Sequence, residues 1–174
     1  GGASLTYVLD ELRDIDLSYL SKQEAKEFTL LLEELDLREK RERSCSTFYK
    51  FVESIWPEFI AGAHHKKMAA AFDRIAEGTL KRLIVNMPPR HTKSEFASYL
   101  FPAYLLGKRP KLKIIEATHT ADLAINFGRR VRDLLDTEEY AELFTQTQLK
   151  ADSRSAGKWQ TNQGGEYFAS GIGG

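Results

Sequence analysis

The chain has 174 residues, 42% of them hydrophobic and 29% charged, which is typical of a globular domain and excludes a wholly disordered segment. Its 25 basic residues balance 25 acidic ones, so only a local basic patch would argue for nucleic-acid binding. Cys45 is the single cysteine, which excludes an intrachain disulfide or a cysteine metal cluster. No apolar run has the length of a membrane span and no signal-peptide pattern is present, so we expect neither a membrane protein nor a secreted one.

Residues 1–44 are predicted to form an N-terminal helical segment. Ser21 followed by Glu24 is the pattern of a capping box at the head of a helix. Apolar residues then recur at helical spacing: Phe28, Leu31, Leu32 and Leu35. The charges of residues 38–43 are mixed in sign, which favours a solvated helix face over a DNA-binding patch.

The next part of the chain changes from helical to mixed patterns. Residues 47–55 and 64–77 are predicted to be short helices, ended by Pro57 and near Gly78. The apolar run Leu83–Val85 is predicted to be a buried strand, followed by a proline-rich loop and a long helix from about Lys93.

The pattern then alternates again. Residues 113–117 are predicted to be a strand and residues 121–135 a helix, which extends a βαβ alternation and predicts an α/β fold with a parallel sheet. Residues 159–161 and 166–169 flank a glycine-containing turn and are predicted to pair as a hairpin.

The stretch whose residues could bind a ligand is the loop that joins the predicted strand at Leu83–Val85 to the helix at Lys93. A helix N-terminus offers free N–H groups and a partial positive charge to an anion, and the Lys93-Ser94 pair would add an ammonium group and a hydroxyl. The usual phosphate-loop pattern has two glycines, and Met87 and Thr92 occupy those positions here. Spacing alone therefore leaves an ordinary helix-capping turn equally open.

The sequence of residues 86–95, Asn-Met-Pro-Pro-Arg-His-Thr-Lys-Ser-Glu, resembles the deviant Walker A loop of tailed-bacteriophage terminase large subunits. Three further stretches resemble that family in the same order along the chain: Trp56-Pro57 with His64-His65, residues 117–124, and residues 157–174. The resemblance covers about residues 45–174.

This resemblance implies a P-loop NTPase fold of the RecA/ASCE type, in which helices flank a parallel sheet. Residues 45–174 would be a partial ATPase domain, with the sheet incomplete at its C-terminal end. The Walker B carboxylates would lie just beyond Gly174, and the nuclease domain of the family would be absent. An ATPase is expected of the full-length protein, whereas these 174 residues alone are expected to hydrolyse little or no ATP.

The resemblance also implies site residues and the cofactors ATP and Mg²⁺. Lys93 would contact the β- and γ-phosphates, Ser94 would ligate magnesium, and Arg90 would sense or stabilise the γ-phosphate, although a surface salt bridge is the alternative for Arg90. The nucleotide-binding stretch would comprise Pro89, Arg90, His91, Thr92, Lys93, Ser94 and Glu95. The adenine pocket has weaker candidates, for which an apolar wall is the alternative: Trp56, His64 and His65.

Ring ATPases of this kind often receive an arginine from a neighbouring subunit. The candidates are Arg129, Arg130 and Arg132, and for each of them a solvated helix face remains the simpler explanation. A local basic cluster offers weak candidates for DNA contacts: Lys108, Arg109, Lys111 and Lys113.

The expected function is therefore the motor portion of a terminase large subunit, which packages double-stranded viral DNA into procapsids. Its partners would be double-stranded DNA, the portal protein, the small terminase subunit and further copies of itself in a ring, in the host cell cytoplasm. Two alternatives stay open. A helicase-type translocase would share the strand–loop–helix unit, and a catalytically inactive α/β interaction module would bind no nucleotide.

Overall fold

The computed structural model describes residues 5–88, 92–153 and 155–172. Residue contacts divide the chain into two compact units, residues 1–44 and 45–174. Along the stretches described, no helix combines the length and the apolar character that a membrane crossing needs.

The first unit is a pair of helices, α1 (Leu5–Arg13) and α2 (Lys22–Ser44), joined through a short 3₁₀ turn at Leu17–Tyr19. The predicted capping box is confirmed, because Ser21 N–H donates to Glu24 Oε2 at 2.8 Å and Glu24 N–H donates to Ser21 Oγ at 3.3 Å. Exposed polar pairs join the two helices: Thr6 donates to Glu39 at 2.8 Å and Arg13 binds Asp36 at 2.6 Å. No residue of α2 is buried, so the apolar stripe predicted there is at most half-covered.

The second unit begins with α3 (Phe48–Ile55) and α4 (Ala63–Ala76), as the sequence predicts. Thr47 caps α3 by accepting a hydrogen bond from Lys50 N–H at 3.2 Å. Gly78, with φ of +81°, follows the end of α4 in the left-handed conformation that glycine tolerates best.

The predicted strand at Leu83–Val85 is wrong, because residues 80–88 have no regular secondary structure. Leu83, Val85 and Met87 are half-buried against the core, whereas Ile84 between them is 85% exposed. The alternation of a strand is thus present, but among the residues described no strand pairs with this segment.

After the loop, a helix opens at Lys93, passes through a π-helical turn at Glu95–Leu100, called η2, and continues as α5 (Phe101–Lys108). The chain then forms β1 (Lys113–Thr118), α6 (Ala121–Leu135) and α7 (Glu138–Leu143). It ends in the hairpin strands β2 (Lys158–Gln160) and β3 (Glu166–Gly171), and the predicted hairpin is confirmed.

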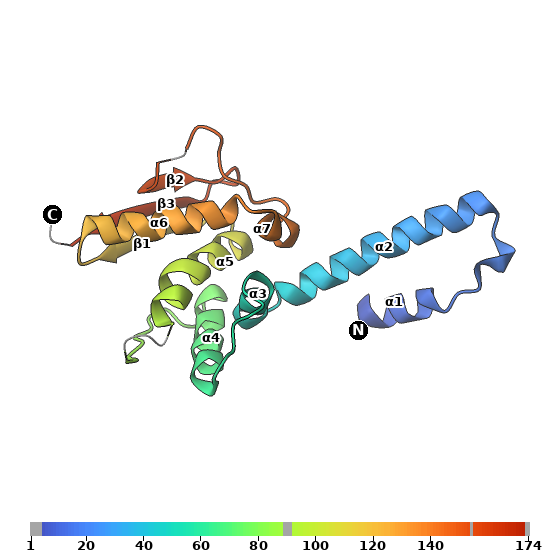
Figure 1. The fold of residues 1–174 in the computed structure, drawn as a ribbon, viewed down its shortest axis with the longest axis horizontal. Helices are drawn as coiled ribbons and strands as arrows, with labels where there is room; N and C mark the ends of the chain where they lie inside the picture. The colour runs from blue at the N-terminus through green and yellow to red at the C-terminus, as the bar shows by residue number, and fades with distance from the viewer. Residues whose placement is uncertain (1–4, 89–91, 154, 173–174) are drawn as a thin grey trace. The chain divides into compact units, whose positions relative to one another are not determined.

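The sheet is mixed, not parallel as predicted. Its strand order is β1-β3-β2, with β3 parallel to β1 and antiparallel to β2. Helix α6 runs along β1 and β3 on one face (Figure 1). On the other face the neighbours Ile115 and Phe168 are 73% and 46% exposed, so this face of the sheet is largely open to solvent.

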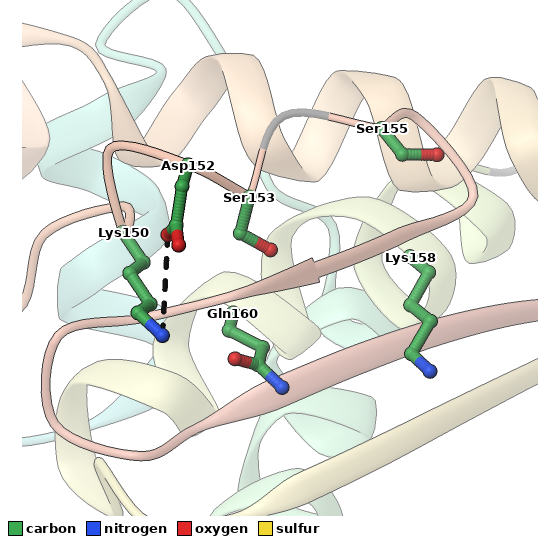
Figure 2. Close-up of a pocket in the computed structure, with 6 residues that line it drawn as sticks. All are labelled: Lys150, Asp152, Ser153, Ser155, Lys158 and Gln160. Carbon is green, nitrogen blue, oxygen red and sulfur yellow. Dashed lines mark ion pairs between the residues drawn. The ribbon is translucent and has the colours of Figure 1, made fainter.

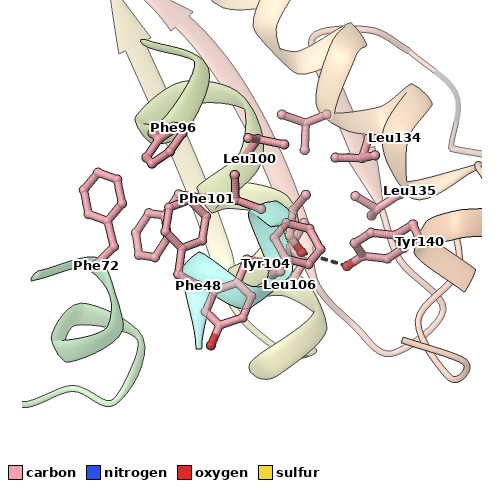
Figure 3. Packing of buried hydrophobic residues seen from close by; sticks show 14 of the residues in the cluster. Phe48, Phe72, Phe96, Leu100, Phe101, Tyr104, Leu106, Leu134, Leu135 and Tyr140 are labelled. Atoms are coloured by element: carbon pink, nitrogen blue, oxygen red, sulfur yellow. Dashed lines mark hydrogen bonds between the residues drawn. The ribbon is translucent and has the colours of Figure 1, made fainter. Parts of the chain in front are cut away.

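The core of the second unit is aromatic (Figure 3). The fully buried Phe48 ring lies with its centroid 5.4 Å from those of Phe72 and Phe101 and 5.6 Å from that of Phe96, which joins α3 and α4 to the helix after the loop. Asp73 binds the start of α3 by accepting a hydrogen bond from Phe48 N–H at 2.7 Å. The helix that follows the loop is therefore fixed by large apolar contacts, each aromatic side chain burying about 150–250 Å².

A second packing centre fixes α6 to the hairpin. The Trp159 and Tyr167 rings stack with their centroids 4.9 Å apart, and Trp159 Nε1 donates to Gly128 O at 3.0 Å. A Cβ atom at Gly128 would approach Ala156 O to 2.5 Å, so only glycine permits this close contact.

Candidate functional site

The helix after the loop begins where the sequence predicts it. Lys93 and Ser94 are its first residues, and Thr92 O accepts a hydrogen bond from Phe96 N–H at 3.0 Å. Ser94 is exposed and Lys93 is half-buried. The N–H groups of the first helical turn have no partner within a helix, so they are available to an anion at this end.

Thr92 has a left-handed backbone, with φ of +56°. It is a β-branched residue at the second glycine position of the phosphate-loop pattern, and a residue of this type in that conformation costs about 1–3 kcal/mol. Thr92 thus has a positive φ, which glycine adopts freely and a β-branched residue disfavours. Surrounding contacts must hold such a strained residue in place.

The Lys93 side chain turns back over the loop. Its ammonium group donates to Met87 O at 3.2 Å, and Met87 occupies the first glycine position of the pattern. The two ends of the predicted phosphate loop are therefore joined by the lysine that the pattern assigns to phosphate. The predicted phosphate-contacting residues Pro89, Arg90 and His91 lie outside the described residues.

His65 reaches the loop from the first turn of α4. It is 7% exposed, and its two ring nitrogens face different parts of the chain. Nδ1 accepts from Gly62 N–H at 2.9 Å, and Nε2 lies 2.6 Å from Thr92 Oγ1. The Phe59 and Phe96 rings pack against the imidazole at centroid distances of 4.8 and 5.4 Å, which fixes its orientation.

The weaker adenine candidates lie in one aromatic cluster beside the loop. The Trp56 ring is 4.7 Å from the Phe59 ring, and Phe59 in turn contacts His65. His64 is exposed, with its ring centroid 3.8 Å from that of His65. Trp56 is half-buried against the core. An adenine contact by these residues stays a prediction.

Glu95 forms a bidentate ion pair with Arg130 of α6. The two guanidinium nitrogens donate to the two carboxylate oxygens at 2.9 and 2.6 Å, and the guanidinium carbon lies 4.3 Å from the centroid of the Tyr99 ring. The hydrogen bonds to Glu95 raise the pKa of Arg130 above its usual value. The pair joins the helix after the loop to α6. It involves Glu95, which is predicted to contact the nucleotide, and Arg130, which is a predicted candidate for action in trans.

The other two arginines of α6 differ in their surroundings. Arg132 donates to its neighbour Asp133 at 2.8 Å, whereas Arg129 is exposed. In the basic cluster, Lys108 donates to Cys45 O at 3.1 Å and Lys113 pairs with Glu166 at 3.7 Å. The roles predicted for these residues in trans and toward DNA stay predictions.

Glu116 of β1 is a half-buried carboxylate that contacts the hairpin. Glu116 Oε2 accepts from the Tyr167 hydroxyl at 2.5 Å, whereas Oε1 is the one buried side-chain polar atom of the described residues without a hydrogen-bond partner. Burial raises the pKa of the Glu116 carboxyl, and the hydroxyls of Tyr167 and Ser98 offset this only in part. Burial also raises the pKa of Tyr167.

A surface pocket of about 280 Å³ lies beside β2 (Figure 2). Its lining is polar and comes from the segment before the hairpin and from β2 itself: Lys150, Asp152, Ser153, Ser155, Lys158 and Gln160. Lys150 and Asp152 form a loose ion pair at 3.9 Å. None of these residues belongs to the predicted phosphate loop.

The described stretches contain no group of three or more histidine, cysteine, aspartate or glutamate side chains with metal-binding geometry. Magnesium in nucleotide sites usually has one or two protein ligands, and phosphate oxygens and water supply the rest. The exposed Ser94 hydroxyl at the helix start fits that kind of site.

Sequence reasoning missed the pairings of His65 with Thr92, Glu95 with Arg130 and Glu116 with Tyr167. The partners are 27, 35 and 51 residues apart, so no local spacing rule connects them. The one local signal was Thr92 itself, a non-glycine residue at a position where the pattern expects glycine.

Comparisons with protein-family models, with curated proteins and with solved structures gave no significant match.

Proposed function

We propose that this chain is the ATP-binding motor portion of a terminase large subunit and that residues 87–94 form its phosphate loop. The observation that carries the proposal is the geometry around Lys93. A lysine and a hydroxyl residue open a helix, directly after a residue with the left-handed backbone of the usual loop glycine. An ordinary helix-capping turn requires neither the strain at Thr92 nor the contact between Lys93 and Met87 O.

In this proposal the residues of the chain divide the work of binding. Lys93 exchanges its contact with the Met87 carbonyl for the outer phosphates of ATP, and the first N–H groups of the helix bind the same anion. The Ser94 hydroxyl ligates the magnesium ion that accompanies the nucleotide. The P-loop NTPase fold belongs to the proposal, and the mixed three-stranded sheet supplies only the coarser α/β class.

Titration with a fluorescent ATP analogue in the presence of Mg²⁺ tests the phosphate loop. Lys93→Ala is expected to weaken binding by at least about tenfold, because a charge-assisted contact to phosphate contributes about 1.5–3 kcal/mol. Lys67→Ala is the matched control, since it removes the same charge from an exposed position of α4. Equal binding by wild type and Lys93→Ala would remove the assignment and favour an inactive interaction module.

Competition between duplex and single-stranded DNA of equal length separates the motor classes. A packaging motor is expected to prefer the duplex when an ATP analogue that resists hydrolysis is present. A clear preference for the single strand would favour a helicase-type translocase instead. Both measurements should be made at two salt concentrations, because phosphate contacts weaken as salt rises.

A further inference from the structure

Thr92 is held from two sides. Its carbonyl accepts the hydrogen bond from Phe96 N–H at 3.0 Å, and its hydroxyl lies 2.6 Å from His65 Nε2. The backbone at this residue has the positive φ that disfavours a β-branched side chain. A strained residue persists only where its surroundings fix it, and these two contacts contribute to that constraint.

The hydrogen bonds of His65 identify its protonation state and tautomer. Nδ1 accepts from Gly62 N–H at 2.9 Å, so it carries no proton, and a neutral imidazole then has its proton on Nε2. Nε2–H is therefore the donor and Thr92 Oγ1 the acceptor. The ring has one donor and one acceptor, and each has a partner within the chain.

Contacts other than the one with Thr92 also fix the position of the His65 ring. His65 is buried against the Phe59 ring, at 4.8 Å and 80°, and the Phe96 ring, at 5.4 Å and 45°. Its bond to Gly62 ties it to the start of α4. The donor that reaches Thr92 therefore comes from a rigid helix and a packed core.

We propose that His65 is a positioning residue of the phosphate loop, which holds Thr92 in the left-handed conformation and thereby directs Lys93 toward the anion. This inference rests on the proposed function for its effect on nucleotide binding. The contact between His65 and Thr92 replaces what glycine supplies by its freedom in the usual loop. A helix-borne imidazole thus compensates for the missing glycine.

A double-mutant cycle tests this compensation. His65→Phe keeps the aromatic packing but removes both hydrogen bonds, and it is expected to weaken binding of the fluorescent ATP analogue about tenfold. In Thr92→Gly, the glycine adopts a positive φ without the His65 contact, so this variant is expected to bind the ATP analogue within about threefold of wild type. In the Thr92→Gly background, His65→Phe should then change binding by less than about threefold, because little is left for the imidazole to hold.

Two further variants keep the test decisive. His65→Gln retains an N–H donor near the Nε2 position and should bind more tightly than His65→Phe. Ala70→Gln places the same amide at an exposed position of α4 and should bind as wild type does. An equal loss from His65→Phe in both backgrounds would overturn the proposal, and so would the absence of any loss in the Thr92 background.

Thermal unfolding without nucleotide separates this inference from the proposed function. His65→Phe should lower Tm more in the Thr92 background than in the Thr92→Gly background, and the ring ¹⁵N spectrum of the wild type should show the proton on Nε2. Equal shifts in Tm, or a proton on Nδ1, would refute the positioning role even if ATP binds. Nucleotide binding that is insensitive to Lys93→Ala would instead refute the proposed function, whatever the Tm cycle shows.

Discussion

The core around Phe48 and the loop that ends at Thr92 place opposite demands on the chain. Phe48 is fully buried, and four of its ring neighbours lie between 5.4 and 5.6 Å away. The loop carries an exposed Ile84 and a strained Thr92. Phe96 belongs to both, since it packs on Phe48 and on His65. Stability therefore resides in the core, which supports a loop that would not hold its conformation alone.

The largest expected effect is on the core. Phe48→Ala should lower the free energy of unfolding by about 3–5 kcal/mol, because it opens a cavity among aromatic rings that the backbone cannot refill. Urea unfolding followed by circular dichroism measures this. Ile60→Ala is the control at a side chain that is 91% exposed, and it should change little. A loss below about 1 kcal/mol for Phe48→Ala would mean that the core is not the main source of stability.

An intermediate effect is expected where the helix after the loop meets α6. Arg130→Gln should cost about 1–2 kcal/mol of stability, from a partly exposed bidentate pair with Glu95 and a cation–π contact with Tyr99. The exposed Arg129 offers Arg129→Gln as the matched control in the same unfolding measurement. If both variants lose the same stability, the Glu95 pair does not anchor this helix.

The half-buried carboxylate of Glu116 predicts a dependence of stability on pH. Burial raises the folded-state pKa of Glu116, so the folded protein holds this proton more tightly than the unfolded chain does. Below the unfolded value of about 4.3 the group costs nothing, and stability falls as pH rises from there through the folded pKa. Compared with Glu116→Gln, the wild type should lose stability as pH rises above about 4.3, the usual unfolded value.

Unfolding curves of both proteins across this pH range measure the difference. Glu58→Gln, at an exposed carboxylate, should follow the wild type at every pH. Parallel curves for the wild type and Glu116→Gln would show that the carboxylate is solvated in the folded protein.

The smallest effect is expected in the loop. Ile84→Ser should change the free energy of unfolding by less than about 0.5 kcal/mol, because the side chain is 85% exposed and the segment pairs with no strand that the structure describes. The same unfolding measurement applies. A loss above about 1 kcal/mol would contradict this expectation, since it would place the Ile84 side chain in a buried contact in solution.

Local patterns predicted much of the scaffold. Helix α6 spans residues 121–135 as predicted, and Thr120 Oγ1 caps its start by accepting from Leu123 N–H at 3.3 Å. The hairpin follows from its turn, in which Gly164 has φ of +87°. These features depend on neighbours within a few residues, so the sequence displays them directly.

The errors came from requirements that are not local. Leu83–Val85 has the apolar residues of a strand, but a strand also needs a partner with free backbone groups, and the sequence shows no such pairing. The start of the helix at Lys93 was predictable from its residues, whereas the support that His65 gives to Thr92 was not. Packing of α4 against the loop creates that contact, and no spacing rule reports it.

The sole cysteine gives the protein a built-in reporter. Cys45 is 9% exposed, and its thiol donates to Leu143 O at 3.5 Å, which ties the segment before α3 to the end of α7. A thiol reagent added to the native protein can react with Cys45 only after the structure around this residue opens locally. The rate of its reaction therefore measures local opening, and a cysteine introduced at an exposed position would react first and carry a spectroscopic label alone.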